Sequence, residues 1–121
     1  MFLIIEKNGV LAEIYHRLLL NAGYHGCIKS NYGEALNVDD KENFNIDLVV
    51  LSLGKDADGS DKGDIIKIMG KFRKCKIFLI IDEMTPSIRK IIGDHKIDLW
   101  LTKPFIPSEL LKRISLAKSK D

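Results

Sequence analysis

The chain has 121 residues, 45% of them hydrophobic and 30% charged, a balance that indicates one folded domain over residues 1–121 and excludes a disordered protein. Its formal net charge is +2, from 19 lysines and arginines against 17 aspartates and glutamates, which is too balanced to indicate direct binding to nucleic acid. No apolar run reaches the roughly 20 residues of a membrane helix, and the short apolar start at residues 2–5 is not a secretory signal, so we expect a cytoplasmic protein without membrane contacts.

The first part of the chain alternates between strand and helix patterns. Residues 2–5 are a continuous apolar run, typical of a strand that is buried on both faces. A helix is then predicted between Asn8, a residue type that caps helices, and Gly23, a residue type that ends them. Its apolar side is marked by Leu11, Ile14, Leu18 and Ala22 at helical spacing, with Tyr15 and Leu19 beside them.

The patterns that predict the next elements differ in strength. Residues 26–29 indicate a weak edge strand, and residues 31–42 a second helix with little apolar content. Asp47–Ser52 is the clearest strand of the chain. Residues 53–61 are rich in glycine, aspartate and lysine, which is typical of a loop. A third helix follows, and its buried side is expected to contain Ile65, Ile68, Met69 and Phe72.

The last part of the chain continues the alternation. Residues 76–81 form an almost entirely apolar strand. Thr85 followed by Pro86 predicts a fourth helix, because threonine caps helices and proline favours their first position. Residues 97–101 are predicted to form the fifth strand, and Ser108 to cap the last helix.

Five apolar strands alternating with five amphipathic helices predict an α/β fold with a parallel sheet covered on both faces. The simplest arrangement is the flavodoxin-like, doubly wound (βα)5 fold with strand order 2-1-3-4-5. In this order Cys27 and Cys75 lie on strands that are not neighbours, so we expect two reduced, buried thiols.

Open α/β sheets carry their sites at the carboxyl ends of the strands, where the strand order reverses. Here the ends of the first, third, fourth and fifth strands meet at that point. The candidate site residues are therefore Glu6, Lys7, Ser52, Ile81, Asp82 and Lys103.

The strand that ends in Ser52, the later turn Lys103-Pro104-Phe105 and the size of the chain resemble the response-regulator receiver domain of two-component signalling. The resemblance covers the whole chain. In that family two acidic residues after the first strand hold a divalent ion, and the third strand ends in the aspartate that accepts a phosphoryl group. The fourth strand supplies a serine or threonine, and the fifth supplies a lysine.

Position by position, the resemblance implies a degenerate site. The lysine is kept as Lys103 and one acid as Glu6, but Lys7 replaces the second acid. Ser52 stands at the position of the acceptor aspartate. The hydroxyl position falls on Ile81, with Asp82 beside it.

Magnesium binding is expected to be weak or absent, and we expect no cofactor. Magnesium usually requires one or two carboxylates, and Glu6 stands alone. If Lys7 points inward, its charge about 4 Å from the ion would oppose binding by roughly 4 kcal/mol at an effective dielectric of 20. If Lys7 instead extends into solvent, that argument is weaker.

Two surfaces could contact a partner. The first, built from the fourth helix, fifth strand and fifth helix, is expected to mediate a homodimer or bind another signalling protein, and it carries Arg89, Asp98, Trp100, Glu109 and Arg113. The second is a basic cluster that either contacts an acidic partner or is a solvated face, and it consists of Lys67, Lys71, Arg73, Lys74 and Lys76.

The sequence leaves three functions open. The first is a receiver-like module, not an enzyme, that signals by protein–protein contacts without aspartyl phosphorylation. The second is phosphorylation at another residue, either Ser52, Asp56 or Asp58. The third is a small-molecule sensor that uses the altered pocket.

Overall fold

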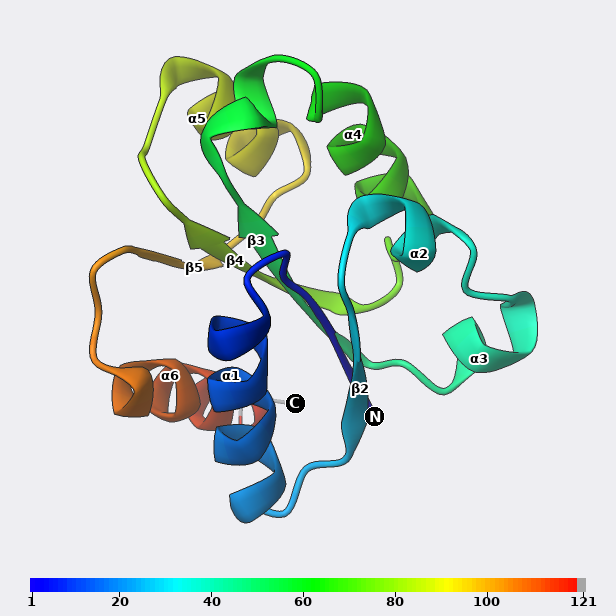
Figure 1. Ribbon diagram of the computed structural model, residues 1–121, viewed down its shortest axis with the longest axis vertical. Coiled ribbons are helices and arrows are strands. Elements are labelled where there is room, and N and C mark those ends of the chain that lie inside the picture. Colours follow the sequence, from blue (N-terminus) through cyan, green and yellow to red (C-terminus); the bar gives the residue numbers. More distant parts are fainter. Residues whose placement is uncertain (120–121) are drawn as a thin grey trace.

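Five parallel strands form one sheet in the order β2-β1-β3-β4-β5, the flavodoxin-like order that the sequence predicts (Figure 1). The computed structural model describes residues 1–119, with side chains described to residue 117. Its elements in chain order are β1 (Phe2–Ile5), α1 (Gly9–Asn21), β2 (Gly26–Lys29), α2 (Tyr32–Leu36), α3 (Asp40–Phe44), β3 (Leu48–Leu53), η1 (Lys55–Asp58), α4 (Lys62–Lys71), β4 (Lys76–Ile81), α5 (Pro86–Asp94), β5 (Leu99–Thr102) and α6 (Pro107–Ser119).

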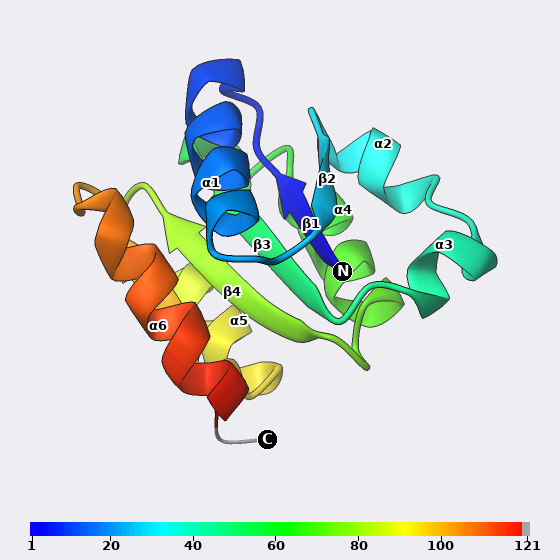
Figure 2. The ribbon, with the colours of Figure 1, turned by 90° about the horizontal axis from the view of Figure 1, so that it is seen from below.

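Helices cover both faces of the sheet, as Figures 1 and 2 show. One face packs against α1 and α6, and the other against α2, α4 and α5. Consecutive residues of a strand point to opposite faces, so β1, β3 and most of β4 are buried along their whole length. Burial of these apolar strands, at about 25 cal/mol per Å², is the main force that positions the strand ends where the site lies.

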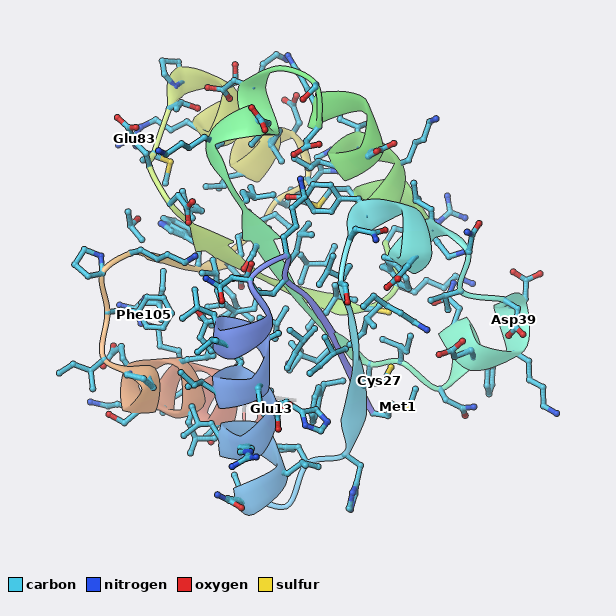
Figure 3. The ribbon with its side chains drawn as sticks, in the orientation of Figure 1. Met1, Glu13, Cys27, Asp39, Glu83 and Phe105 are labelled. Carbon is cyan, nitrogen blue, oxygen red and sulfur yellow. The ribbon has the colours of Figure 1, made fainter. Side chains whose placement is uncertain are left out.

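Helix α1 begins and ends where the sequence predicts, and its buried side centres on two of the predicted apolar residues, Tyr15 and Leu19. The Asn8 side chain accepts hydrogen bonds from the N–H groups of the first turn, and Gly23 has a φ of +92°, which favours glycine. The buried residues are Ala12, Tyr15 and Leu19, whereas the predicted Ile14 is 41% exposed. Phe105 packs on this side of the helix, because its ring points toward α1 and stacks on the buried Tyr15 ring at 6.1 Å (Figure 3).

The single helix predicted over residues 31–42 is wrong, because this segment forms two short helices. Asn31 caps α2, but the helix ends at Leu36 and α3 begins separately at Asp40. Asp39 caps α3 by accepting a hydrogen bond from the N–H of Glu42 at 2.7 Å. Aspartate and asparagine side chains compete with helical hydrogen bonds, which favours a break between the two segments over one long helix.

Other boundaries shift by a few residues. The loop over residues 53–61 contains the 3-10 turn η1, and β5 begins at Leu99, two residues later than predicted. Helix α6 begins at Pro107, so Ser108 lies inside its first turn and is not its cap. Proline is favoured at the first helical position, because its missing N–H has no helical partner there.

The two cysteines are free, as predicted, but they are half-buried and not fully buried. Burial raises the pKa of Cys27 and of Cys75 above the ordinary thiol value. No helix among residues 1–119 has the length and apolarity needed to cross a membrane.

Candidate functional site

The carboxyl ends of β1, β3, β4 and β5 meet around a hollow of about 260 Å³. Of the residues that the sequence predicts for this site, five line the hollow: Glu6, Lys7, Ser52, Asp82 and Lys103. The fold brings them together because parallel strands present all their carboxyl ends at one edge of the sheet.

Glu6 and Ser52 form the buried floor of the site. Each is only 7% exposed, and the Ser52 hydroxyl donates a hydrogen bond of 2.8 Å to Glu6 Oε1. The other carboxylate oxygen of Glu6 accepts a hydrogen bond from the N–H of Asn8 at 3.2 Å. A buried carboxylate is costly unless it is paired or hydrogen-bonded, and these donors together with Lys103 satisfy that requirement.

Lys103 links the two acids of the site. Its Nζ lies 2.8 Å from Asp82 Oδ1 and 3.6 Å from Glu6 Oε1. The pKa of Lys103 is raised above its ordinary value. Partial burial acts to lower it, but the hydrogen bond to Asp82 and the charge of Glu6 outweigh this effect. The ammonium group is therefore firmly charged and has its partners within the protein.

Lys7 pairs with an acid that lines the same hollow. Its Nζ lies 2.8 Å from Asp61 Oδ2 and 4.9 Å from the centre of the Tyr32 ring, and its side chain is 54% exposed. Of the two orientations considered for Lys7, the structure shows an ammonium group that is held by Asp61 and the Tyr32 ring at the lining of the hollow. Lys7 thus ties the end of β1 to Asp61, the residue before α4.

Ile81 does not contribute its side chain to the site. It is fully buried against α5, in the core that contains Ile88 and Ile91. Ser52 pairs with Ile80 in the sheet register, and strand residues alternate between faces. The residues of β4 and its end that share the face of Ser52 are therefore Ile80 and Asp82.

Tyr32 is a site residue that the sequence analysis misses. Its hydroxyl donates a 2.7 Å hydrogen bond to the backbone carbonyl of Ser52, and burial, assisted by Asp61 and Glu6, raises its pKa. The sequence analysis also misses Asp61, which lines the same hollow. Lys7 and its partner Asp61 are 54 residues apart, so no local spacing reveals the contact.

The two acids at the strand ends, Glu6 and Asp82, are not free to hold a magnesium ion. Oxygen ligands must be available to bind magnesium, but Glu6 and Asp82 both lie against Lys103, and Glu6 also accepts from Ser52 and Asn8. Among the described residues, no group of three or more acidic, histidine or cysteine side chains is arranged to hold a metal. Weak or absent magnesium binding stays a prediction.

The predicted partner face is brought together only in part. Trp100 is half-buried, and its ring packs against the core on the α4 and α5 side of the sheet. On α6, Arg113 pairs with Glu109 at 3.1 Å and also donates to the backbone carbonyl of Trp100 at 3.5 Å. Arg89 and Asp98 are exposed.

No family model and no curated protein matches the chain, but solved structures share its fold. A CheY-like response regulator receiver domain protein from Methanospirillum hungatei JF-1 has a TM-score of 0.79 at 18% identity, over 98% of this chain and 93% of that chain. The non-phosphorylated HemR receiver domain from Leptospira biflexa has a TM-score of 0.79 at 23% identity, over 98% and 93%.

A Burkholderia pseudomallei response regulator with a phosphorylated aspartic acid, calcium ion and citrate has a TM-score of 0.70 at 20% identity, over 98% of this chain and 71% of that chain. The chain thus has the fold of response regulator receiver domains.

Proposed function

We propose that the chain is a receiver-like signalling module, not an enzyme, that acts through protein–protein contacts without aspartyl phosphorylation. The observation that carries the proposal is the pairing of Ser52 with Glu6 at the buried end of β3. Receivers place the acceptor aspartate at this position, and here a hydroxyl donates to a carboxylate that the family uses for its metal.

The charges around Ser52 support the proposal. A phosphoryl group in transfer needs cations that neutralise its developing charge. In this chain Lys103 is paired with Asp82, and Lys7 with Asp61. Both lysines would have to leave a carboxylate before they could serve a phosphoryl group.

Phosphorylation at another residue is the first alternative. A phosphate on Ser52 would place two more negative charges beside the buried Glu6, which is unfavourable without a new cation. Asp58 already accepts a hydrogen bond of 2.9 Å from Thr85. Asp56 is exposed and lines the hollow, so it is the best of the three acceptors.

The chemistry of the adduct separates these acceptors. A phosphoserine at Ser52 is a stable ester, whereas an acyl phosphate at Asp56 or Asp58 is cleaved by hydroxylamine. Intact mass before and after hydroxylamine treatment therefore assigns any phosphoryl group to one class. A hydroxylamine-sensitive adduct that persists in an Asp56→Asn variant would point to Asp58.

Small-molecule sensing at the same hollow is the second alternative. Ligand pockets usually measure about 300–1,000 Å³, and this hollow measures about 260 Å³. Its lining is crowded with paired charges, which favours water or a small ion over an organic ligand. A thermal-shift screen with small metabolites tests this alternative.

The proposal is tested by a magnesium titration followed through the fluorescence of Trp100, the single tryptophan. Trp100 lies on β5, the strand that leads to Lys103. We expect no saturable change below about 1 mM, a dissociation constant that corresponds to roughly 4 kcal/mol of binding. A saturable change below that concentration, lost in a Glu6→Gln variant, would contradict the proposal.

A further inference from the structure

A second surface lies at the opposite end of the sheet, where β3 and β4 begin. Two hollows of about 800 and 670 Å³ adjoin there, and they share Arg73, Cys75 and Lys76 in their linings. We call the two adjoining hollows together the amino-end groove. It is remote from the site around Ser52, because the strands run from one end to the other.

The first wall of the amino-end groove is α3, which ends in Phe44. None of the five residues of α3 is buried, and Phe44 is 91% exposed, more than any other large hydrophobic side chain described. Figures 1 and 2 both show α3 at the periphery of the molecule, where Asp39 marks its start in Figure 3. An exposed aromatic side chain beside a hollow is a feature of binding surfaces.

The opposite wall is basic. Its cations are supplied by the end of α4 and the turn into β4, and they are Lys71, Arg73, Lys74 and Lys76. Lys71 donates to the carbonyl of Leu36 at 3.1 Å. Within the described part of the chain, neither Arg73 nor Lys74 forms an ion pair, and both are exposed.

The acidic residues of the groove limit what it can bind. The first hollow also contains Asp40 and Asp47, and the second contains Asp98. Asp47 is paired with the amino terminus at 3.1 Å, but Asp40 and Asp98 are exposed. A nucleic-acid backbone would meet these carboxylates along its length, whereas a peptide can place its few charges against the cations alone.

We propose that the amino-end groove docks an acidic peptide segment of a partner protein, with a bulky apolar side chain against Phe44 and carboxylates on Arg73 and Lys74. Arginine binds carboxylates in a fixed two-pronged geometry, and Phe44 supplies the apolar anchor that such interfaces need. The proposal does not depend on the chemistry at Ser52.

The first experiment selects binders from a displayed library of short random peptides, using the whole chain as bait. We expect the enriched peptides to carry several aspartates or glutamates around an aromatic or branched aliphatic residue. Synthetic, fluorescein-labelled copies should bind in fluorescence polarisation, and their affinity should fall as salt rises. Failure to enrich peptides, or enrichment without acidic residues, would overturn the proposal.

Substitutions test whether the peptides bind in the amino-end groove. Phe44→Ser and the double change Arg73→Glu with Lys74→Glu should each weaken peptide binding by about tenfold or more. Val10→Ser, at a side chain that is 71% exposed on α1, and Lys112→Glu on α6 are the matched controls and should leave affinity within about twofold. Equal loss in the control variants, or none in the groove variants, would contradict the proposal.

Alkylation of the two cysteines gives an independent readout. Cys75 lines both hollows, whereas Cys27 lies on β2, and both thiols are half-buried. Bound peptide should slow the alkylation of Cys75 and leave that of Cys27 unchanged. Unchanged alkylation rates at both thiols would contradict the proposal. Tighter, groove-dependent binding of single-stranded oligothymidine would identify a surface for nucleic acid instead. A dimer that Phe44→Ser abolishes would identify a surface for self-association.

Discussion

At the scale of single residues, Ser52 does what an ionised aspartate cannot do at this position. A hydroxyl can donate a hydrogen bond, whereas an ionised carboxylate only accepts. Glu6 is buried and needs donors, and it receives them from Ser52, from the N–H of Asn8 and from the nearby Lys103. Serine at this position therefore stabilises the buried acid.

The first prediction follows from this pairing. We expect Ser52→Asp to place two carboxylates together, to lower the free energy of unfolding by about 1–3 kcal/mol, and not to give magnesium-dependent labelling by a small phosphoryl donor. Urea unfolding and intact mass measure the two effects. Ser52→Ala is the control, since it removes the donor without adding charge. Rapid, magnesium-dependent labelling of Ser52→Asp would contradict this account.

The second prediction concerns alkaline pH. Burial, with help from Asp61 and Glu6, raises the pKa of Tyr32 above its ordinary value of 10.0. The unfolded chain therefore releases this proton first, so the folded state holds more protons and the free energy of unfolding falls as pH rises above about 10. Tyr32→Phe should remove part of that fall, at a cost of about 0.5–1.5 kcal/mol at neutral pH for the lost hydrogen bond to Ser52.

Urea unfolding at several pH values between about 8 and 11 measures this effect. Tyr15 also has a pKa raised by burial, so Tyr32→Phe should flatten the profile without making it level. Parallel profiles for the wild type and Tyr32→Phe would show that Tyr32 is not the source of the pH dependence.

At the scale of the elements, the edge strand β2 depends on one glycine. Gly26 pairs with Phe2 in the sheet, and a Cβ at this position would overlap the Phe2 carbonyl oxygen and ring. Gly26→Ala should therefore destabilise the fold by roughly 1–3 kcal/mol through overpacking. Thermal or urea unfolding measures the change.

Gly63 in α4 is the matched control, because nothing lies within 4 Å of a Cβ built there. Gly63→Ala should be neutral or stabilise by up to about 1 kcal/mol, since alanine favours helices. If the two glycine variants unfold alike, the close contact between β1 and β2 does not constrain this strand.

The second element-scale prediction tests the face formed by α5, β5 and α6. Trp100 keeps part of its ring exposed while the rest packs on the core, so Trp100→Ala should weaken self-association or partner binding and lower stability only moderately. Trp100→Phe should retain most of both, because aromatic area remains. Sedimentation velocity over a concentration series measures association. Unfolding of Trp100→Ala without any change in a complex would make Trp100 a core residue only.

The sequence predicts the sheet better than the helices. Strands such as β3 and β4 are buried on both faces, and their apolar runs reveal them directly. The break between α2 and α3 depends on competition between caps and helix, which a count of apolar residues does not detect. The start of α6 at Pro107 is missed because Ser108 is taken as the cap.

The candidate site is predictable in its position and not in its contacts. The fold alone places Glu6, Ser52 and Lys103 together, because strand ends converge. The contacts of Lys7 with Asp61 and of Tyr32 with Ser52 are long-range, and they require the packed structure. Ile81 is wrongly placed because a one-residue shift along a strand moves a side chain to the other face.

At the scale of the whole molecule, the two ends of the sheet differ in electrostatic character. At the carboxyl ends, Lys103 and Lys7 are paired with Asp82 and Asp61. At the amino ends, Arg73 and an exposed Phe44 face solvent. In the function that we propose, the fold serves as a scaffold whose recognition surfaces lie outside the site around Ser52.

The most direct test of this account is intact mass spectrometry after incubation of the wild-type chain with acetyl phosphate and magnesium. The account predicts no gain of a phosphoryl group, because Ser52 donates to Glu6 and the two acids at the strand ends, Glu6 and Asp82, are held by Lys103. A rapid, magnesium-dependent gain of one phosphoryl group that hydroxylamine removes would contradict it.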